Sequence, residues 1–140
     1  MKHNFPNRKQ SVQVAVLVEH KNKYLLLKKE KKESWEIPRG TVNFAEHPDA
    51  AAVRNIFEDT ALNISPHFVD FTDAEFRHKH GEHAHYVLLI YTAKAPTNKL
   101  TLHDEDLDEH KWVTSAQLEK EDLDSVSQEI LKTLKTEGKL

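Results

Sequence analysis

The run of residues 12–18, Val-Gln-Val-Ala-Val-Leu-Val, is the feature that most limits what this chain can fold into. It is rich in β-branched residues and almost entirely apolar, which is typical of a strand that is buried on both faces. A polar turn at residues 20–23 separates it from a second apolar run at residues 24–27. The two runs predict a hairpin that opens a sheet and contains a buried strand.

Residues 48–61 predict a helix with two different faces. Pro48 stands in the first turn, where its missing N–H is not needed. At about 100° per residue, one arc of the helix holds Ala52, Val53, Ile56, Phe57 and Thr60, and the opposite arc holds Ala51, Arg54, Asn55, Glu58 and Asp59. The first arc is the expected core face, and the second is available for solvent or for chemistry.

More strands follow this helix. Residues 67–79 and 83–93 predict a second hairpin around Gly81-Glu82, because two apolar or alternating runs flank a short turn. An acidic loop at residues 103–109 then leads into a short strand at residues 110–114.

A closing helix is expected near residues 124–137. Ser125 and Gln128 stand at capping-box spacing at its start, and Gly138 follows its end. Strands, a helix, more strands and a closing helix predict an α+β fold or an α/β/α sandwich. No linker or repeat divides the chain, so residues 1–140 are expected to form a single domain.

The charge balance and the absence of cysteine exclude several classes of function. The chain of 140 residues has 20 Lys+Arg against 23 Asp+Glu, a net charge of −3 that provides no overall field to recruit nucleic acid or a membrane. With no cysteine there is no disulfide, thiolate metal site or cysteine nucleophile. The polar start and the short apolar runs predict a soluble, cytoplasmic protein. A small domain with apolar strand edges could be a monomer or a homodimer.

A spaced set of residues between Gly40 and Leu62 carries the functional signal. Its spacing resembles the Nudix box, G-x5-E-x7-R-E-U-x-E-E-x-G-U, where U is a bulky aliphatic residue. The positions that match without insertion or deletion are Gly40, Glu46, Arg54, Ile56, Glu58 and Leu62. An isolated Arg-Glu pair would suggest only a solvated helix face, so the resemblance depends on the whole set and on the Trp-Glu-Ile-Pro that leads into Gly40.

The resemblance implies a Nudix-type α/β/α sandwich with a mixed sheet and a metal-dependent pyrophosphohydrolase. Its substrate would be a nucleoside diphosphate linked to another moiety, as in a nucleoside triphosphate, a dinucleoside polyphosphate or ADP-ribose. The Gly40 carbonyl and the Glu58 and Asp59 carboxylates are the expected ligands of Mg²⁺ or Mn²⁺, since these ions prefer hard oxygen atoms. Arg54, one turn before Glu58, can hold that carboxylate in an ion pair. Metal ions between carboxylates and a diphosphate would neutralise charge during attack of water on phosphorus.

Three positions depart from the box: Asn55 and Asp59 replace glutamates, and Ala61 replaces a glycine. An asparagine carries no charge and cannot take up a proton at neutral pH, so the general base is expected elsewhere, at Glu46 or at Glu105 in the acidic loop. If φ is positive after the helix, alanine there is expected to cost about 1 kcal/mol. The alternative function is a catalytically impaired module that binds or senses a nucleotide.

Four histidines surround the expected turn of the second hairpin. If Gly81-Glu82 is a two-residue turn, they share one face of the sheet. The four are His78, His80, His83 and His85. His78 and His85 are candidates for contact with the nucleotide, while a Zn²⁺ or pH-responsive surface and an ordinary exposed hairpin tip remain alternatives.

Arg39 and several aromatic residues are further candidates for substrate contact. Arg39, next to Gly40, could reach a distal phosphate or be an ordinary surface arginine. The side chains that could stack a base, or that could instead pack in the core or the hairpin, are Trp35, Phe44, Phe76 and Tyr86.

Overall fold

The computed structural model describes residues 8–77, 81–102 and 107–140. The elements in these residues are β1 (Arg8–His20), β2 (Lys23–Lys29), β3 (Arg39–Thr41), α1 (Pro48–Thr60), β4 (His67–Arg77), β5 (His83–Lys94), β6 (Leu107–Val113), α2 (Ser115–Leu118) and α3 (Ser125–Thr136). The expected order of strands, helix, strands and closing helix is therefore present.

The strands form one mixed sheet in which β1 is central. The order is β4-β5-β1-β2-β6, and β3 pairs with β1 beside this path. β1 and β5 are parallel, with Gln10 opposite His85 and Glu19 opposite Lys94. The other edge of β1 is shared between β3 and β2, and the predicted turn into β2 is made at Lys21 and Asn22, both with positive φ. The predicted buried strand is confirmed, since residues 14–18 are at most 2% exposed.

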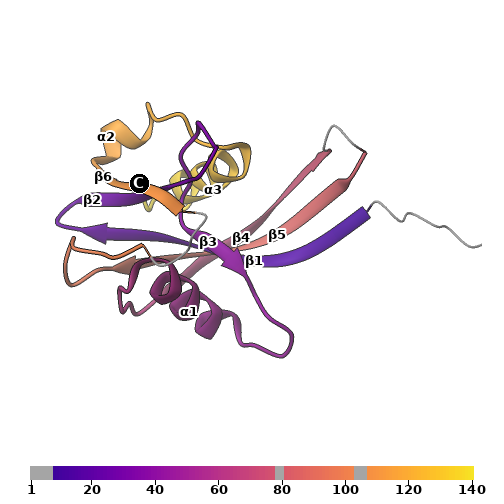
Figure 1. Cartoon of the computed structure of the whole chain (residues 1–140), viewed down its shortest axis with the longest axis horizontal. Helices are drawn as coiled ribbons and strands as arrows, with labels where there is room; N and C mark the ends of the chain where they lie inside the picture. The colour runs from indigo at the N-terminus through magenta and orange to yellow at the C-terminus, as the bar shows by residue number, and fades with distance from the viewer. Residues whose placement is uncertain (1–7, 78–80, 103–106) are drawn as a thin grey trace, which may run out of the picture.

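Helices cover both faces of this sheet (Figure 1). α1 packs through Ala52 and Ile56 on the face that holds Val14 and Val16, and α2 and α3 cover the opposite face. Successive residues of β1 point to opposite sides, so one apolar run supplies both cores. This arrangement confirms the predicted α/β/α sandwich.

Some local predictions were wrong or incomplete. The predicted capping box of Ser125 and Gln128 is not formed, because Asp124 is the N-cap of α3 and accepts a hydrogen bond from the Ser127 amide at 2.8 Å. β6 begins at Leu107, before the predicted 110–114, since it pairs with β2 from Tyr24 to Lys29. β3 and α2 were not predicted, because segments of three or four residues carry too little periodicity.

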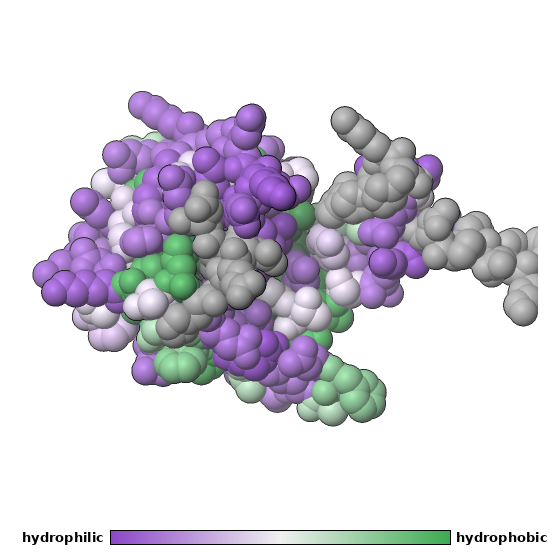
Figure 2. Space-filling view, viewed as in Figure 1, coloured by the Kyte–Doolittle hydropathy of each residue, from purple (hydrophilic) through white to green (hydrophobic). Residues whose placement is uncertain are grey.

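The first half of β1, the end of β4 and the start of β5 extend beyond the helices as an arm (Figure 1). The surface is largely hydrophilic in the view of Figure 2, with hydrophobic residues at the end of the loop between β3 and α1. Phe44 of that loop is fully exposed. Among the described residues, no helix has the length and apolar character needed to cross a bilayer.

Candidate active site

The first turn of α1 is fixed by its cap and by the sheet. His47 precedes the helix, and its Nδ1 atom accepts a hydrogen bond from the Asp49 amide at 3.2 Å. The buried hydroxyl of Tyr91 on β5 donates to Asp49 Oδ1 at 2.7 Å. Burial, and then this bond to a carboxylate, raise the pKa of Tyr91 far above its ordinary value. Together these contacts hold the start of α1 against β5.

Arg54 connects α1 to the loop that precedes it. Its Nε and Nη2 atoms donate to the two carboxylate oxygens of Glu46 at 2.7 and 2.9 Å, which is a bidentate pair. Nη1 donates to Glu58 Oε2 at 3.1 Å, so the ion pair expected from the sequence is present. Nη2 also donates to the Thr41 carbonyl at 2.9 Å. One guanidinium thus orients two carboxylates and the end of β3.

Glu46 is held in its ionised form. The hydrogen bonds from Arg54, followed by one from the Asn43 amide at 3.0 Å, lower its pKa from 4.5 to about 2. The turn that returns Glu46 toward Arg54 passes through Ala45, whose φ is 62°. A carboxylate this acidic is a poor base near neutral pH, so the geometry favours Glu46 as a positioning residue.

Asn55 lies directly against Gly40. A Cβ atom on residue 40 would overlap the Oδ1 and Cγ atoms of Asn55. The Asn55 amide nitrogen donates to the carbonyls of Ala51 and Thr41, at 2.9 and 3.2 Å. The glycine is therefore needed for close approach of a side chain and not for a positive φ. Asn55 thus stands where the motif has a glutamate, and its uncharged side chain connects α1 to β3.

The oxygen atoms near this link decide which kind of metal site is possible. The Glu58 side chain is 58% exposed and shares one oxygen with Arg54, and Asp59 beside it is partly buried. Within residues 8–77, 81–102 and 107–140, no three His, Asp or Glu side chains are grouped so that they could hold a metal ion. The donors fit Mg²⁺ or Mn²⁺ that keeps waters and substrate phosphates among its ligands, and they do not form a complete protein cage.

A cleft of about 630 Å³ lies along β1 beside Thr41. Gln10 and Gln13 of β1 and Tyr86 of β5 line it. The Oε1 atom of Gln13 is buried and has no hydrogen-bond partner among the described residues. Because a buried acceptor is costly when nothing donates to it, this atom suits an N–H or O–H group of a ligand.

Arg39 lies on the α3 face of the sheet. Its Nη1 atom donates to Asp124 Oδ2 at 2.9 Å and lies 3.7 Å from Glu36 Oε2, and its side chain is 13% exposed. This guanidinium ties the start of α3 to β3. A role in phosphate binding would require it to leave both carboxylates.

The histidines of β5 are paired with carboxylates on β4. His85 Nε2 lies 2.8 Å from Asp73 Oδ2, and its Nδ1 lies 2.8 Å from the Gln10 side-chain amide. His83 Nε2 lies 3.2 Å from Glu75 Oε2. Both ring nitrogens of His85 are therefore occupied in this structure.

Several of the sequence candidates lie elsewhere. His78, His80 and Glu105 fall outside the described residues, as does the side chain of Phe76. Trp35 stacks under the ammonium groups of Lys28 and Lys111, at 5.8 and 4.2 Å from the ring centre, so its ring is part of a structural contact. Of the three aromatic candidates whose side chains the structure describes, Tyr86 is the one that lines the cleft beside Thr41.

Two residues of this region were not singled out from the sequence. Gln13 is the only polar residue in the apolar run 12–18, and this break in the apolar pattern could have marked it as a candidate. Thr41 contributes its backbone carbonyl, which accepts from both Arg54 and Asn55 and leaves no signature in the side chain.

Comparisons with known proteins agree with this arrangement. A family model described as the NUDIX domain matches residues 8–134. An RNA pyrophosphohydrolase of Ruthia magnifica subsp. Calyptogena magnifica is 27% identical, and the match covers 70% of this chain and 64% of that protein. The chain therefore spans less than two thirds of the curated relative that it matches.

Solved structures share the fold at low sequence identity. The MutT protein from Methanosarcina mazei Go1 has a TM-score of 0.77 and 19% identity, covering 95% of this chain and 98% of that one. The NUDIX domain of Shewanella oneidensis NrtR, complexed with ADP ribose, has a TM-score of 0.70 and 17% identity, covering 94% and 89%. At these identities the similarity shows a shared fold and nothing more.

Proposed function

Because this chain belongs to the Nudix hydrolase family, we propose that it cleaves a phosphoanhydride bond of a nucleotide bound between α1 and the cleft beside β3. The observation that carries this proposal is the set of contacts around Arg54, which fixes Glu46, Glu58 and the Thr41 carbonyl in one place. Thr41 also lines the cleft, so the oriented carboxylates and the space for a ligand adjoin.

The cleft suits a nucleotide in size and chemistry. Its volume of about 630 Å³ lies in the range of small-molecule sites. Tyr86 offers an aromatic ring, and the buried Oε1 of Gln13 offers an acceptor to a base N–H or a ribose hydroxyl. The substrate class is a nucleoside diphosphate joined to another moiety.

Mg²⁺ or Mn²⁺ would be held by the Gly40 carbonyl, Glu58 and Asp59 together with phosphate oxygens, where it would neutralise charge on the diphosphate. Arg54 positions Glu58, and Glu46 positions Arg54, through the bidentate pair. Neither Arg54 nor Glu46 needs to change protonation state for this role.

Neither Asn55 nor Glu46 suits the role of proton acceptor for the attacking water. Asn55 cannot take up a proton at neutral pH, and Glu46 is too acidic to do so efficiently. We propose Glu105 for this role, because it stands in the acidic run at residues 104–106 that precedes β6 in the sequence. Its replacement by glutamine should lower turnover about 10²-fold or more while nucleotide affinity changes little.

Product formation tests this function directly. The protein is incubated with Mg²⁺ or Mn²⁺ and with ADP-ribose, dinucleoside polyphosphates, nucleoside triphosphates and an RNA substrate, and both binding and products are measured. Glu58→Gln should abolish turnover, because it removes a carboxylate beside the metal. Glu129→Gln on α3 is the matched control and should leave turnover unchanged, since this exposed helical glutamate lies on the opposite layer. Turnover that survives Glu58→Gln would contradict the assignment.

A second candidate function is nucleotide binding without turnover. It is favoured by the Asn55 amide, which donates to two backbone carbonyls and supplies neither charge nor base at a motif position. Saturable nucleotide binding with no product under all metal conditions would establish this alternative.

A further inference from the structure

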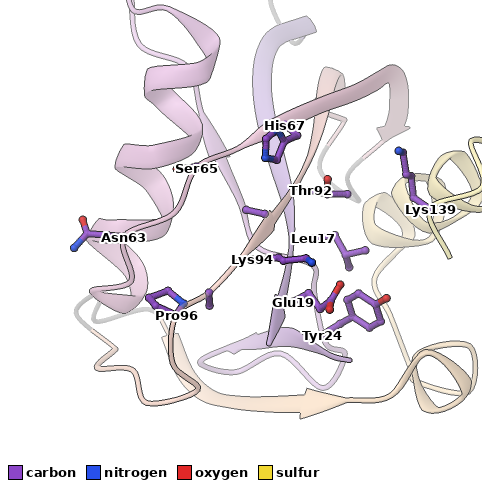
Figure 3. A pocket seen from close by; sticks show the side chains of 12 residues that line it. Leu17, Glu19, Tyr24, Asn63, Ser65, His67, Thr92, Lys94, Pro96 and Lys139 are labelled. Carbon is purple, nitrogen blue, oxygen red and sulfur yellow. The ribbon is translucent and has the colours of Figure 1, made fainter. Parts of the chain in front are cut away.

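A second cavity, of about 560 Å³, lies at the other end of the sheet (Figure 3). It contains no residue of the Nudix box, and it is bounded by the ends of β1 and β5, the segment after α1 and the segment after α3. The cavity is therefore separate from the cleft beside Thr41, and the proposed function does not use it.

The floor of this cavity consists of two rows of neighbouring side chains on the α3 face of the sheet. Register partners in a sheet point to the same side, so each row is contiguous across the strands. One row is Tyr24, Glu19 and Lys94, and the other is Leu17, Thr92 and His67. Leu17 is buried in the core on the α3 face, which identifies the side to which both rows point.

Helix α3 covers the neighbouring part of this face but ends before it reaches these rows. Its buried Ile130 and Leu134 pack with Leu88 and Ile90, and the helix stops at Thr136. The chain then turns at Gly138, whose φ is 71°, and the Lys139 amide donates to the Leu134 carbonyl at 2.9 Å. The backbone of Lys139 is thereby fixed at the cavity wall.

The opposite wall is also held in place. The Ala95 amide donates to the Glu19 carbonyl at 2.7 Å, and the Ala95 carbonyl accepts from His20 Nδ1 at 2.9 Å. These bonds fix the bend after β5, which brings Pro96 to the cavity. Figure 3 shows the Asn63 side chain, on the segment after α1, pointing away from the cavity.

Two lysines stand at the rim of the cavity, and its floor combines the apolar Leu17 and the ring of Tyr24 with polar side chains. Lys94 and Lys139 line it, are exposed, and have no carboxylate within ion-pair distance in the described part of the chain. Glu19 is the single carboxylate among the lining residues. Burial, and then the charge of Glu19, raise the pKa of Tyr24, so its hydroxyl stays protonated and can donate.

We propose that this cavity is a second ligand site, which binds a small organic anion with a flat apolar body. The body lies on Leu17 and the ring of Tyr24, and the anionic group lies between the ammonium groups of Lys94 and Lys139. Long lysine side chains can follow an anion placed at the rim, because each ammonium sits on a flexible stem. Apolar burial supplies contact area, and the two cations select the sign of charge.

The test compares two dyes that share a body and differ in charge. The anionic probe is 8-anilinonaphthalene-1-sulfonate, and the neutral one is N-phenyl-1-naphthylamine. Each is titrated into the intact folded chain, with dye fluorescence to obtain Kd and with amide chemical shifts to locate the site. We expect one anionic dye per chain, with the largest shifts at residues 92–95, and a Kd at least about fivefold higher for the neutral dye.

Matched lysine variants isolate the role of the rim. Lys94→Gln and Lys139→Gln should each raise the Kd of the anionic dye about fivefold and leave that of the neutral dye unchanged. Lys120→Gln removes an ammonium group that is also exposed but lies outside the cavity, and it should change the Kd of neither dye. The amide spectrum of each variant shows that it remains folded.

Four results would each overturn the proposal. They are no saturable binding of the anionic dye, equal affinity for both dyes, equal effects of Lys94→Gln and Lys120→Gln, and shifts centred on Gln13 and Thr41. The last result would assign the dye to the proposed substrate cleft. Because the readout is dye binding, failure here leaves the hydrolysis assay and its Glu58→Gln result unaffected.

Discussion

The carboxamide of Asn55 occupies the space that a Cβ atom on residue 40 would fill, so Gly40 and Asn55 are complementary. The contact joins β3 to the middle of α1 and is reinforced by the hydrogen bond from Asn55 to the Thr41 carbonyl. It also places an uncharged group at a motif position that normally bears a carboxylate. The same contact therefore affects both the stability of the fold and the proposed site.

Gly40→Ala should destabilise the protein by about 1–3 kcal/mol, because the new methyl group displaces the Asn55 side chain and breaks its hydrogen bonds. In an Asn55→Ala background the same change should cost about 1 kcal/mol less, since the obstructing carboxamide is absent. Urea unfolding of the four proteins measures this coupling. Strictly additive free energies would show that the two residues are not in steric conflict.

Asn55→Glu should raise the metal-dependent rate by about 10²-fold, because it restores a charged oxygen ligand or base to the site. Without metal the variant should be about 1–3 kcal/mol less stable, since a carboxylate cannot donate to the Ala51 and Thr41 carbonyls. Turnover and melting temperature with and without Mn²⁺ are the measurements. Asn55→Gln controls for side-chain length, and an equal rate gain in that variant would refute the role of charge.

The low pKa of Glu46 predicts an acid-sensitive contribution to stability. Its folded pKa of about 2 lies below the ordinary 4.5, so the ionised form stabilises the fold above pH 4.5 and that contribution is lost as the pH falls from 4.5 toward 2. The difference in unfolding free energy between the wild type and Glu46→Gln should be constant near neutrality and shrink over this window. Glu33→Gln, in an exposed loop, serves as the control. A pH-independent difference would disprove the linkage.

Ala61→Gly should stabilise the protein by about 0.5–1 kcal/mol. Ala61 is the C-cap of α1 and has a φ of 63°, a left-handed conformation that costs an alanine more than a glycine. Ala50→Gly, in the first turn of the same helix, should instead destabilise by up to about 1 kcal/mol. Thermal unfolding of both variants gives the sign of each change in stability. A destabilised Ala61→Gly variant would show that the cap conformation is not strained.

Much of the fold was predictable because its signals are periodic. The apolar run at residues 12–18 and the amphipathic pattern at residues 48–61 each predict which faces are buried, and the structure confirms this for residues 14–18 and for Ala52, Ile56 and Thr60. Two positions of the helix were predicted wrongly, because Phe57 of the expected core arc is 45% exposed and Ala51 of the opposite arc is fully buried. The positive φ expected if alanine follows α1 is also present at Ala61. β3 was not predicted, because three residues are too few to show a periodic pattern of apolar side chains.

The site was predictable in its spacing and less so in its contacts. The motif located Glu46, Arg54 and Glu58, but it did not show that Arg54 would bind Glu46 in a bidentate pair and thereby make it a poor base. Nor could the sequence show that Arg39 would be engaged by Asp124, 85 residues away along the chain. Contacts of this kind depend on how separate layers meet.

The cavity at the end of the sheet was not predictable at all. Its floor exists only because β1, β2, β4 and β5 pair in a particular register, which brings six side chains from distant segments to one face. None of those residues forms a motif along the sequence.

The parallel pairing of β1 with β5 has a consequence for how the chain acquires this structure. Gln10 and its partner His85 are separated by 75 residues, so a long loop must close before the centre of the sheet exists. Pairings of this separation form slowly. During synthesis on the ribosome, the backbone N–H and C=O groups along one edge of the apolar strand β1 stay without their partners until β5 has emerged, and that interval is when the nascent protein is most exposed to aggregation.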